Sequence, residues 1–252
     1  MSGGVDSSVA AYLLKEQGYD CIGCTMRLYD NADAGIPKGH TCCSLSDVED
    51  ARSVAYRLDM PYYVFDYTDA FREKVIRNFV NEYENGRTPN PCIDCNRTMK
   101  FDLLYERAKL LGCDFIATGH YARVRKEDGE YRLYQGKDPT KDQGYVLYQL
   151  TQSRLSHTLF PLGDLDKRTV RKIAAENGFL NAEKPDSQDI CFIPDGDYMA
   201  YLRGSGAALH PGRFLDETGR ELGRHSGAEG YTLGQRRGLG LACGAPVYVL
   251  RK

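Results

Sequence analysis

Three cysteines are placed where a thiol could take part in chemistry. Cys92 and Cys95 lie three positions apart in the Pro-bounded stretch RTPNPCIDC, and Cys191 lies far along the chain in the polar stretch KPDSQDICFIPDGDY. The sequence predicts a helix from Asn96 onward, so Cys95 would stand just before its positive end, which favours the reactive thiolate. The flanking residues of Cys95 and Cys191 therefore favour a chemical role over simple packing.

The remaining cysteines give weaker signals. The chain holds nine cysteines, an odd number, and otherwise reads as an α/β enzyme, so reduced thiols are expected rather than a disulfide framework. We expect four of them to act as small buried apolar residues: Cys21, Cys24, Cys113 and Cys243. The adjacent pair Cys42 and Cys43 fits either a metal or chemical role or a solvent-facing loop.

A second candidate site is the N-terminal stretch SGGVDSSVAAYLL. Gly3 and Gly4 permit a tight turn, Ser7 and Ser8 are suitable first residues for a helix through Leu14, and Gly18 would end that helix. Free N–H groups and hydroxyls at a helix N-terminus bind anions, most often phosphate. The alternative is an ordinary capped Gly-Ser turn.

The N-terminal stretch lacks the lysine of a Walker A loop. Backbone donors and serine hydroxyls would therefore hold a pyrophosphate, and Mg2+ would offset its remaining charge.

Composition limits the classes of protein that fit. The chain has 252 residues, 42% of them hydrophobic, which suffices for one or two domains with a sizeable core. Its formal net charge is −2, so any nucleic-acid surface must be a local patch. It contains neither an apolar run of membrane-spanning length nor an N-terminal signal layout, and we expect a cytoplasmic protein.

Strand and helix patterns alternate along the first half of the chain. Strands are predicted at residues 19–29, 62–67 and 114–121, with helices at 46–59, 69–84 and 96–112 between them. This alternation predicts an α/β fold with a parallel sheet that binds ligands beyond the carboxyl ends of its strands. Residues 121–136 read as a hairpin around Asp128-Gly129.

Three regions are expected from these patterns. Residues 1–140 would form the nucleotide-binding and catalytic domain, 141–205 a mainly helical extension that carries Cys191, and 206–252 the start of a small β domain. The boundary between residues 205 and 206 is placed where the sequence becomes rich in Gly and contains short β-like runs.

Taken together, six stretches resemble the tRNA-specific 2-thiouridylases, which belong to the PP-loop ATP pyrophosphatases. They are SGGVDSSVAAYLL, RTPNPCIDCN…KF, ATGHYARV, KDQGYVLYQL, KPDSQDICFI and YTLGQRRGLG, which extend over nearly the whole chain. The resemblance implies ATP-dependent 2-thiolation of the wobble uridine in the tRNAs for Lys, Glu and Gln. It also implies adenylation of O2, sulfur transfer from a cysteine persulfide, and a persulfide donor such as a cysteine desulfurase or a sulfur-relay protein.

The resemblance assigns a role to each matching residue. Cys191 would carry the persulfide, and Cys95 would be its partner nucleophile, closing a Cys95–Cys191 disulfide as the product leaves. The ATP-binding residues would be Ser2, Gly3, Gly4, Val5, Asp6, Ser7, Met26 and Gly119. The tRNA-binding residues would be Asn90, Pro91, Cys92, His120, Lys141, Asp142 and Gln143.

The chain departs from the family in three places. It lacks the strand that usually precedes the Ser-Gly-Gly loop and the C-terminal barrel, so we expect a chain truncated at both ends that folds poorly and binds tRNA weakly. Cys92 stands where many relatives have Asp. Cys92, Cys95 and Cys191 could hold a [4Fe–4S] cluster, Cys92 could resolve the Cys95–Cys191 disulfide, or Cys92 could stay reduced.

Two other functions stay open at the level of sequence. One is a different PP-loop synthetase that uses ammonia, which would need neither thiol. The other is a non-catalytic RNA-binding module that holds zinc or an iron–sulfur cluster through the same three cysteines.

Overall fold

The computed structural model describes residues 1–29, 45–186, 190–193 and 196–252. Two short parallel strand pairs lie in its first part. Strand β1 (Gly23–Arg27) pairs with β2 (Tyr62–Asp66) in the register Gly23 opposite Tyr62. Strand β3 (Ile116–Ala117) pairs with β6 (Thr158–Leu159). The predicted α/β architecture with parallel strands is confirmed, although the strand expected at 114–121 pairs over two residues only, as far as β6 reaches.

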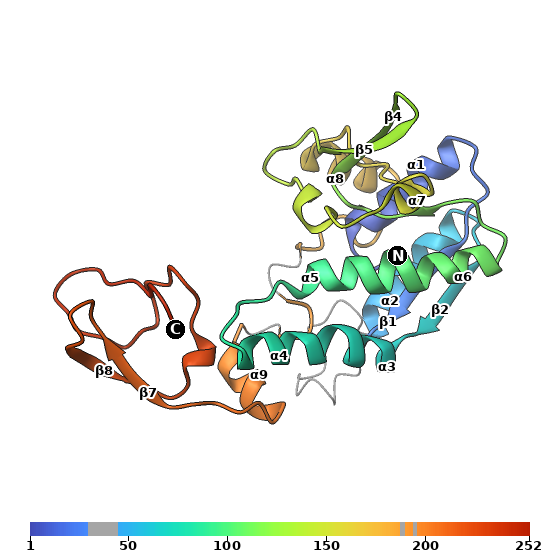
Figure 1. The fold of residues 1–252 in the computed structure, drawn as a ribbon. Coiled ribbons are helices and arrows are strands. Elements are labelled where there is room, and N and C mark those ends of the chain that lie inside the picture. The colour runs from blue at the N-terminus through green and yellow to red at the C-terminus, as the bar shows by residue number, and fades with distance from the viewer. Residues whose placement is uncertain (30–44, 187–189, 194–195) are drawn as a thin grey trace.

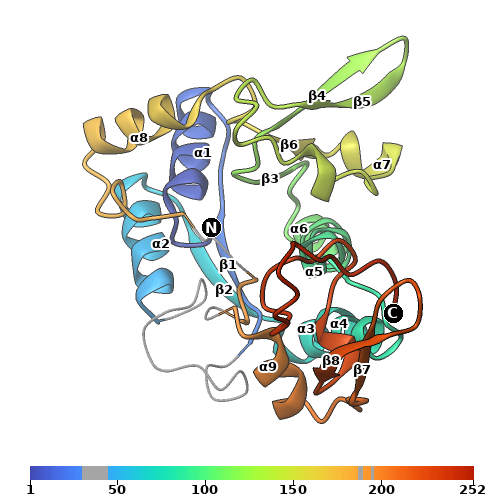
Figure 2. The same cartoon turned by 90° about the vertical axis from the view of Figure 1, so that its left-hand side faces the viewer.

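Helices flank these strands on both sides. Helix α1 (Val5–Glu16), α2 (Leu45–Arg57) and α8 (Lys167–Glu176) lie on one side of β1 and β2. The helical segment from α5 (Pro91–Asp94) to α6 (Tyr105–Leu110) lies on the other (Figure 2). Gly18, with φ of +85°, follows the end of α1 as predicted.

The start of α1 differs from the expectation. The helix begins at Val5 with Gly4 as its N-cap, so Ser7 and Ser8 lie inside the first turns. Their hydroxyls donate to the Gly4 carbonyl at 3.0 and 3.2 Å, the back-bonding that serines make when they are inside a helix.

Two long helical segments follow β2. The first consists of α3 (Thr68–Phe71), a π-helical stretch (Arg72–Ile76) and α4 (Arg77–Glu84). The second consists of α5 (Pro91–Asp94), a π-helical stretch (Cys95–Leu104) and α6 (Tyr105–Leu110). The two segments run side by side (Figure 1).

The second segment corrects the predicted helix start at Asn96. The helix begins at Pro91, whose ring suits the first helical position, and the Asn90 side chain caps it by accepting the Cys92 N–H at 3.1 Å. Cys95 therefore lies one turn inside the helix, and the first turn holds Cys92 instead.

A tight antiparallel hairpin follows β3. It pairs β4 (Ala122–Glu127) with β5 (Glu130–Gln135), and Asp128 and Gly129 at its turn both have positive φ, at 51° and 85°. The predicted hairpin is confirmed, because a two-residue turn of this hand requires positive φ at both positions.

The stretch expected to be mainly helical contains less helix than predicted. Within 141–203 lie a 3-10 turn (Gly144–Val146), α7 (Gln152–Leu155), β6, α8 and most of α9 (Tyr198–Gly204). Turns join them, and residues 180–186 have no regular structure.

The C-terminal part is a small β unit beside α4 and α9 (Figure 1). It consists of the antiparallel pair β7 (Gly212–Leu215) and β8 (Glu221–His225), followed by a 3-10 turn (Ala228–Gly230) and irregular chain. The Ala208 N–H donates to the Glu84 carboxylate at 2.9 Å and joins this unit to α4.

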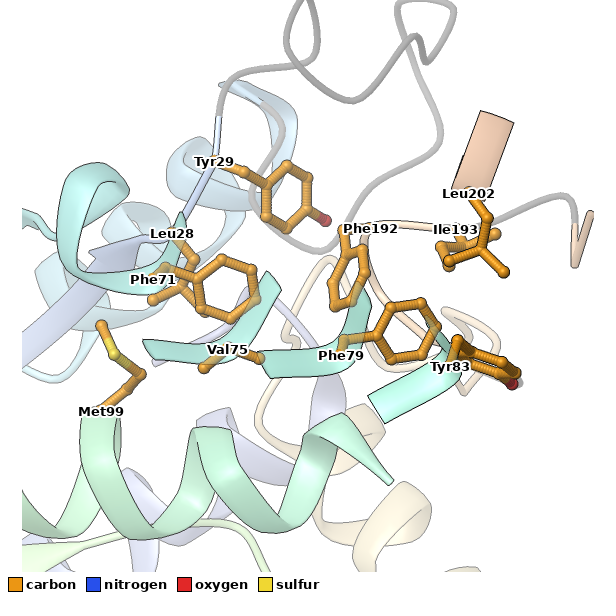
Figure 3. Close-up of a cluster of buried hydrophobic side chains, with 10 residues drawn as sticks. All are labelled: Leu28, Tyr29, Phe71, Val75, Phe79, Tyr83, Met99, Phe192, Ile193 and Leu202. Carbon is orange, nitrogen blue, oxygen red and sulfur yellow. The ribbon is translucent and has the colours of Figure 1, made fainter. Parts of the chain in front are cut away.

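An aromatic core lies between the first helical segment and the chain around residue 192 (Figure 3). Phe192 makes edge contacts with Phe71 and Phe79, at ring centroid distances of 5.7 and 5.4 Å. Tyr29, which follows β1, and Met99, in the middle of the second helical segment, complete it. The core therefore fixes the region of Cys191 against the helices. Among the described residues, none of the helices is both long and apolar enough to cross a membrane.

Candidate nucleotide and sulfur-transfer site

The residues before α1 form a tightly packed turn. Gly3 has φ of +73°, and a Cβ there would lie 2.4 Å from the Asp47 carbonyl oxygen, so only glycine fits. The Ser2 N–H donates to the Ser7 hydroxyl at 3.1 Å. The first N–H groups of a helix have no acceptor within the helix. The turn therefore has the geometry of an anion site.

Asp6, in the first turn of α1 directly after this turn, is neutralised by a lysine from far along the chain. Lys167 Nζ lies 2.7 and 2.8 Å from the two carboxylate oxygens of Asp6, and the Tyr121 hydroxyl donates to one of them at 2.8 Å. Burial raises the pKa of Tyr121, and the nearby Asp6 carboxylate raises it further, so its hydroxyl keeps its proton. The sequence reading missed Lys167, because a lysine at the start of an amphipathic helix carries no distinguishing signal.

Lys167 also connects the turn to the segment before Cys191. Its ammonium lies 2.7 Å from Asp186, which also receives Lys141 at 2.8 Å and Arg171 at 3.1 Å. Burial acts to raise the pKa of the Asp186 carboxyl, but the hydrogen bonds from Lys141 and Lys167 outweigh it and hold that pKa below its usual value. One line of ion pairs thus joins Asp6, Lys167, Asp186 and Lys141.

The residues predicted to complete the ATP site lie beside this turn. A Cβ at Gly119 would lie 2.8 Å from the Asp6 carbonyl carbon, so the backbone of Gly119 approaches the start of α1 closely. Met26, on β1, is partly buried against the aromatic core. Gly119 is thus close to the start of α1.

The predicted tRNA contact His120 is buried. Its side chain is 7% exposed, its Nδ1 lies 2.7 Å from the Thr118 hydroxyl, and its ring lies against Phe101 and Phe160. Burial holds the pKa of His120 well below its usual value, so the ring is neutral. A direct tRNA contact by His120 stays a prediction, and it would require the ring to be uncovered.

The predicted turn Lys141–Gln143 is held mainly by its own side chains. Asp142 accepts the N–H groups of Gly136 and Gly144 at 3.0 and 3.2 Å, and Gln143 accepts the Tyr121 N–H at 3.1 Å. Two of the three side chains therefore shape the turn, and Lys141 is bound to Asp186.

Cys95 and Cys191 border the same aromatic core, although they are 96 positions apart. Both side chains are half-buried, and the Tyr29 hydroxyl donates to the Cys191 carbonyl at 2.6 Å, fixing the backbone at that point. Cys92 is an exposed thiol in the first turn of α5. The two cysteines predicted to react thus pack against the same core.

The four cysteines expected to be small apolar residues are free thiols. Cys21, Cys24, Cys113 and Cys243 are half-buried rather than fully buried, and burial raises the pKa of Cys21 and Cys113, which keeps these thiols protonated. Cys42 and Cys43 lie outside the described residues.

The three-cysteine cluster receives no support from the geometry. Within the ranges that the structure describes, which include Cys92, Cys95 and Cys191, no group of three His, Cys, Asp or Glu side chains is arranged to hold a metal ion. The sequence left the [4Fe–4S] cluster as one of three readings of Cys92, and the arrangement of the donors does not fit it.

The fold and the turn before α1 define an α/β nucleotide-binding protein, and comparisons with known families specify which one. Residues 1–195 match the family model described as "tRNA methyl transferase HUP domain", and residues 201–252 match "tRNA methyl transferase PRC-barrel domain".

Curated relatives name the activity. The chain is 54% identical over 250 residues to "tRNA-specific 2-thiouridylase MnmA" of Clostridium acetobutylicum, covering 99% of this chain and 70% of that protein. It is 52% identical over 253 residues to the protein of the same name from Clostridioides difficile, with 99% and 70% covered. The chain belongs to the tRNA-specific 2-thiouridylases. It is an ATP-binding enzyme of tRNA thiolation, and neither the ammonia-dependent synthetase nor the non-catalytic metal module describes it.

Proposed function

We propose that this chain carries out 2-thiolation of the wobble uridine in the tRNAs for Lys, Glu and Gln, with the residue roles that the motifs imply. The observation that carries the proposal is the position of Cys95 and Cys191 on one core, in a fold whose nucleotide turn is tied to the Cys191 segment. ATP would bind on the turn, with its phosphates at Ser2 to Ser7 and its adenosine between Met26 and Gly119.

The reaction would begin with activation of the base. The uracil O2 attacks the α-phosphate of ATP, pyrophosphate leaves, and O2 becomes part of a good leaving group. N–H groups at the start of α1 stabilise the negative charge of the phosphates and of the departing pyrophosphate.

Sulfur transfer would then use both cysteines. The terminal sulfur of a Cys191 persulfide attacks C2 of the adenylated uracil, and AMP leaves with the former O2. The Cys95 thiolate attacks the Cys191 sulfur, which forms the Cys95–Cys191 disulfide and leaves the transferred sulfur on C2. A dithiol reductant restores both thiols, and a persulfide donor reloads Cys191.

Mg2+ would enter the site bound to ATP. Both carboxylate oxygens of Asp6 are engaged by Lys167, and the described residues offer no group of three metal ligands. Mg2+ usually keeps several waters and binds through substrate phosphates with few protein ligands, which suits a site of this kind. When bound, it would neutralise part of the negative charge of the phosphates.

The tRNA would approach from the side of α5 and the Lys141 turn. Asn90 is exposed at the N-cap of α5 and Cys92 is exposed in its first turn, whereas Pro91 between them is buried. Tyr145 and Tyr148, which follow the Lys141 turn, are 62% and 64% exposed. Exposed aromatic rings stack well on unpaired bases, the usual targets of sequence-specific RNA recognition.

The persulfide donor would be a cysteine desulfurase or a sulfur-relay protein, and the reaction would take place in the cytoplasm, where thiols stay reduced.

Mass spectrometry of tRNA tests the proposal. The protein is incubated with tRNA, ATP, Mg2+ and a low-molecular-weight persulfide, and the nucleosides are then analysed. We expect 2-thiouridine to form in an ATP-dependent manner, with Cys243→Ser as a matched cysteine control that retains activity. Failure of the wild-type protein to form 2-thiouridine, or ATP-independent formation, would overturn the proposal.

A further inference from the structure

A buried amide from outside the nucleotide turn holds that turn in place. Asn181, five positions after the end of α8, is 3% exposed. Its Nδ2 donates to the Gly3 carbonyl and to the Ser8 hydroxyl, both at 2.9 Å. These two bonds join the turn to a segment more than 170 positions away in the sequence.

The bond to Gly3 determines where the next N–H group points. No cis peptide occurs among the described residues, so the Gly3 carbonyl and the Gly4 N–H point to opposite sides of one planar peptide. Because Asn181 binds the carbonyl on one side, the Gly4 N–H faces away from Asn181.

The peptide cannot rotate easily, since Gly3 is confined from another direction. The backbone of Asp47 lies so close that a Cβ at Gly3 would be 2.7 Å from the Asp47 Cα. The φ of +73° at Gly3 is one that glycine alone adopts at low cost. Asn181 and Asp47 together thus fix the orientation of the Gly3–Gly4 peptide.

The other atom of the amide suggests why asparagine is present. Asn181 Oδ1 is buried and has no hydrogen-bond partner among the residues that the structure describes. A buried polar atom without a partner destabilises the fold. An apolar residue would avoid that loss, so the benefit of Asn181 must come from its NH2 group.

We infer that Asn181 is a positioning residue for the ATP phosphates. By holding the Gly3 carbonyl, it orients the Gly4 N–H as a phosphate donor beside the free N–H groups of α1. This inference rests on the proposed ATP site and adds a residue to it that touches no nucleotide itself.

The test compares two amides that make the same kind of bond. Asn181→Asp replaces the donor NH2 by a carboxylate oxygen that repels the Gly3 carbonyl. Asn177→Asp is the matched control, because the Asn177 Nδ2 also donates to a backbone carbonyl, that of Ile173, at 2.9 Å. The dissociation constants for Mg–ATP and for tRNA and the melting temperature are measured for the wild-type protein and both variants.

We expect Asn181→Asp to weaken Mg–ATP binding about tenfold at pH 8, with tRNA binding unchanged. At pH 5 the protonated acid donates to Gly3 again, so the loss should shrink, a pH response that a purely structural role would not produce. Asn177→Asp should bind Mg–ATP like the wild-type protein at both pH values.

A second variant covers the case in which Asn181→Asp does not fold. Ser8→Ala removes the other acceptor and leaves the Gly3 bond, so Mg–ATP affinity should stay within about twofold of wild type. Equal Mg–ATP affinity in Asn181→Asp and Asn177→Asp, or a tenfold loss in Ser8→Ala, would overturn the inference. Failure of the wild-type protein itself to bind Mg–ATP would instead overturn the proposed function.

Discussion

Lys167 Nζ lies 2.7 Å from the Asp6 carboxylate, although the two residues are 161 positions apart in the sequence. The nucleotide turn, which carries no lysine of its own, thus has one beside it, supplied by the first residue of α8. Lys167 also binds Asp186, five positions before Cys191, so one ammonium pairs with carboxylates from two distant parts of the chain.

Replacing Lys167 with Met should destabilise the protein and slow ATP turnover. The Lys167 side chain is 12% exposed, and its loss leaves the Asp6 carboxylate without its cation, whereas Asp186 keeps Lys141 and Arg171. Breaking such a buried pair costs about 3 kcal/mol of unfolding free energy. Lys172→Met is the control, since Lys172 is 73% exposed and its ion pair with Glu176 should contribute less than about 1 kcal/mol. Urea denaturation measures the unfolding free energy of both variants. Equal stability of Lys167→Met and Lys172→Met would contradict a stabilising role for the Lys167 ion pairs.

Asp6→Asn should reduce ATP turnover more than tRNA binding. The variant loses the ion pair with Lys167 and leaves that ammonium to Asp186 alone. We expect pyrophosphate release to fall by at least tenfold, while the dissociation constant for tRNA changes little. Pyrophosphate release equal to that of the wild-type protein across a Mg2+ titration would show that Asp6 has no role in handling ATP.

Cys191→Ser should abolish thiolation and still allow adenylation of tRNA. Cys191 packs against the aromatic core, whereas the proposed ATP site lies at the start of α1, so the proposed roles predict that its loss removes sulfur transfer and spares adenylation. Adenylated tRNA is measured after quenching, with Cys243→Ser as the control. Complete absence of adenylated tRNA in a folded Cys191→Ser protein that binds ATP would argue against separate roles.

Cys92→Asp should leave both iron content and the multiple-turnover rate unchanged. Cys92 is exposed in the first turn of α5, and the described residues contain no three-ligand metal group. Iron content is measured by absorbance and iron analysis after anaerobic reconstitution with iron and sulfide. Iron bound by the wild-type protein and lost in the variant would establish a cluster, and a slower steady-state rate without iron would establish a resolving thiol.

Acid should destabilise the fold through His120. Its folded pKa is depressed by burial, so protons bind the unfolded chain more readily than the native one. The stabilising contribution is therefore fully present above the unfolded pKa of about 6.5 and is lost progressively as pH falls below it. Denaturation between pH 7.5 and 5 should show this slope in the wild-type protein. His120→Gln should flatten it, and an unchanged slope in that variant would assign the effect to other groups.

The sequence alone determined the parts of this protein that depend on neighbouring residues. The hairpin at Asp128-Gly129 follows from two positions that accept positive φ, and the end of α1 follows from Gly18. The motifs around Gly3, Cys95 and Cys191 were sufficient to identify the family. The start of α5 was misjudged, because a proline reads as a helix breaker unless Asn90 is recognised as its cap.

Only the tertiary structure decided which distant side chains meet. Lys167 binds Asp6, Asn181 binds Gly3, and Cys95 and Cys191 pack against one core. Each of these contacts joins segments about 100 to 180 positions apart. No local pattern encodes such contacts, because a lysine on a helix or an asparagine in a loop is compatible with many surroundings. Their roles arise when burial removes water and leaves each polar group dependent on the one partner that the fold brings within hydrogen-bond distance.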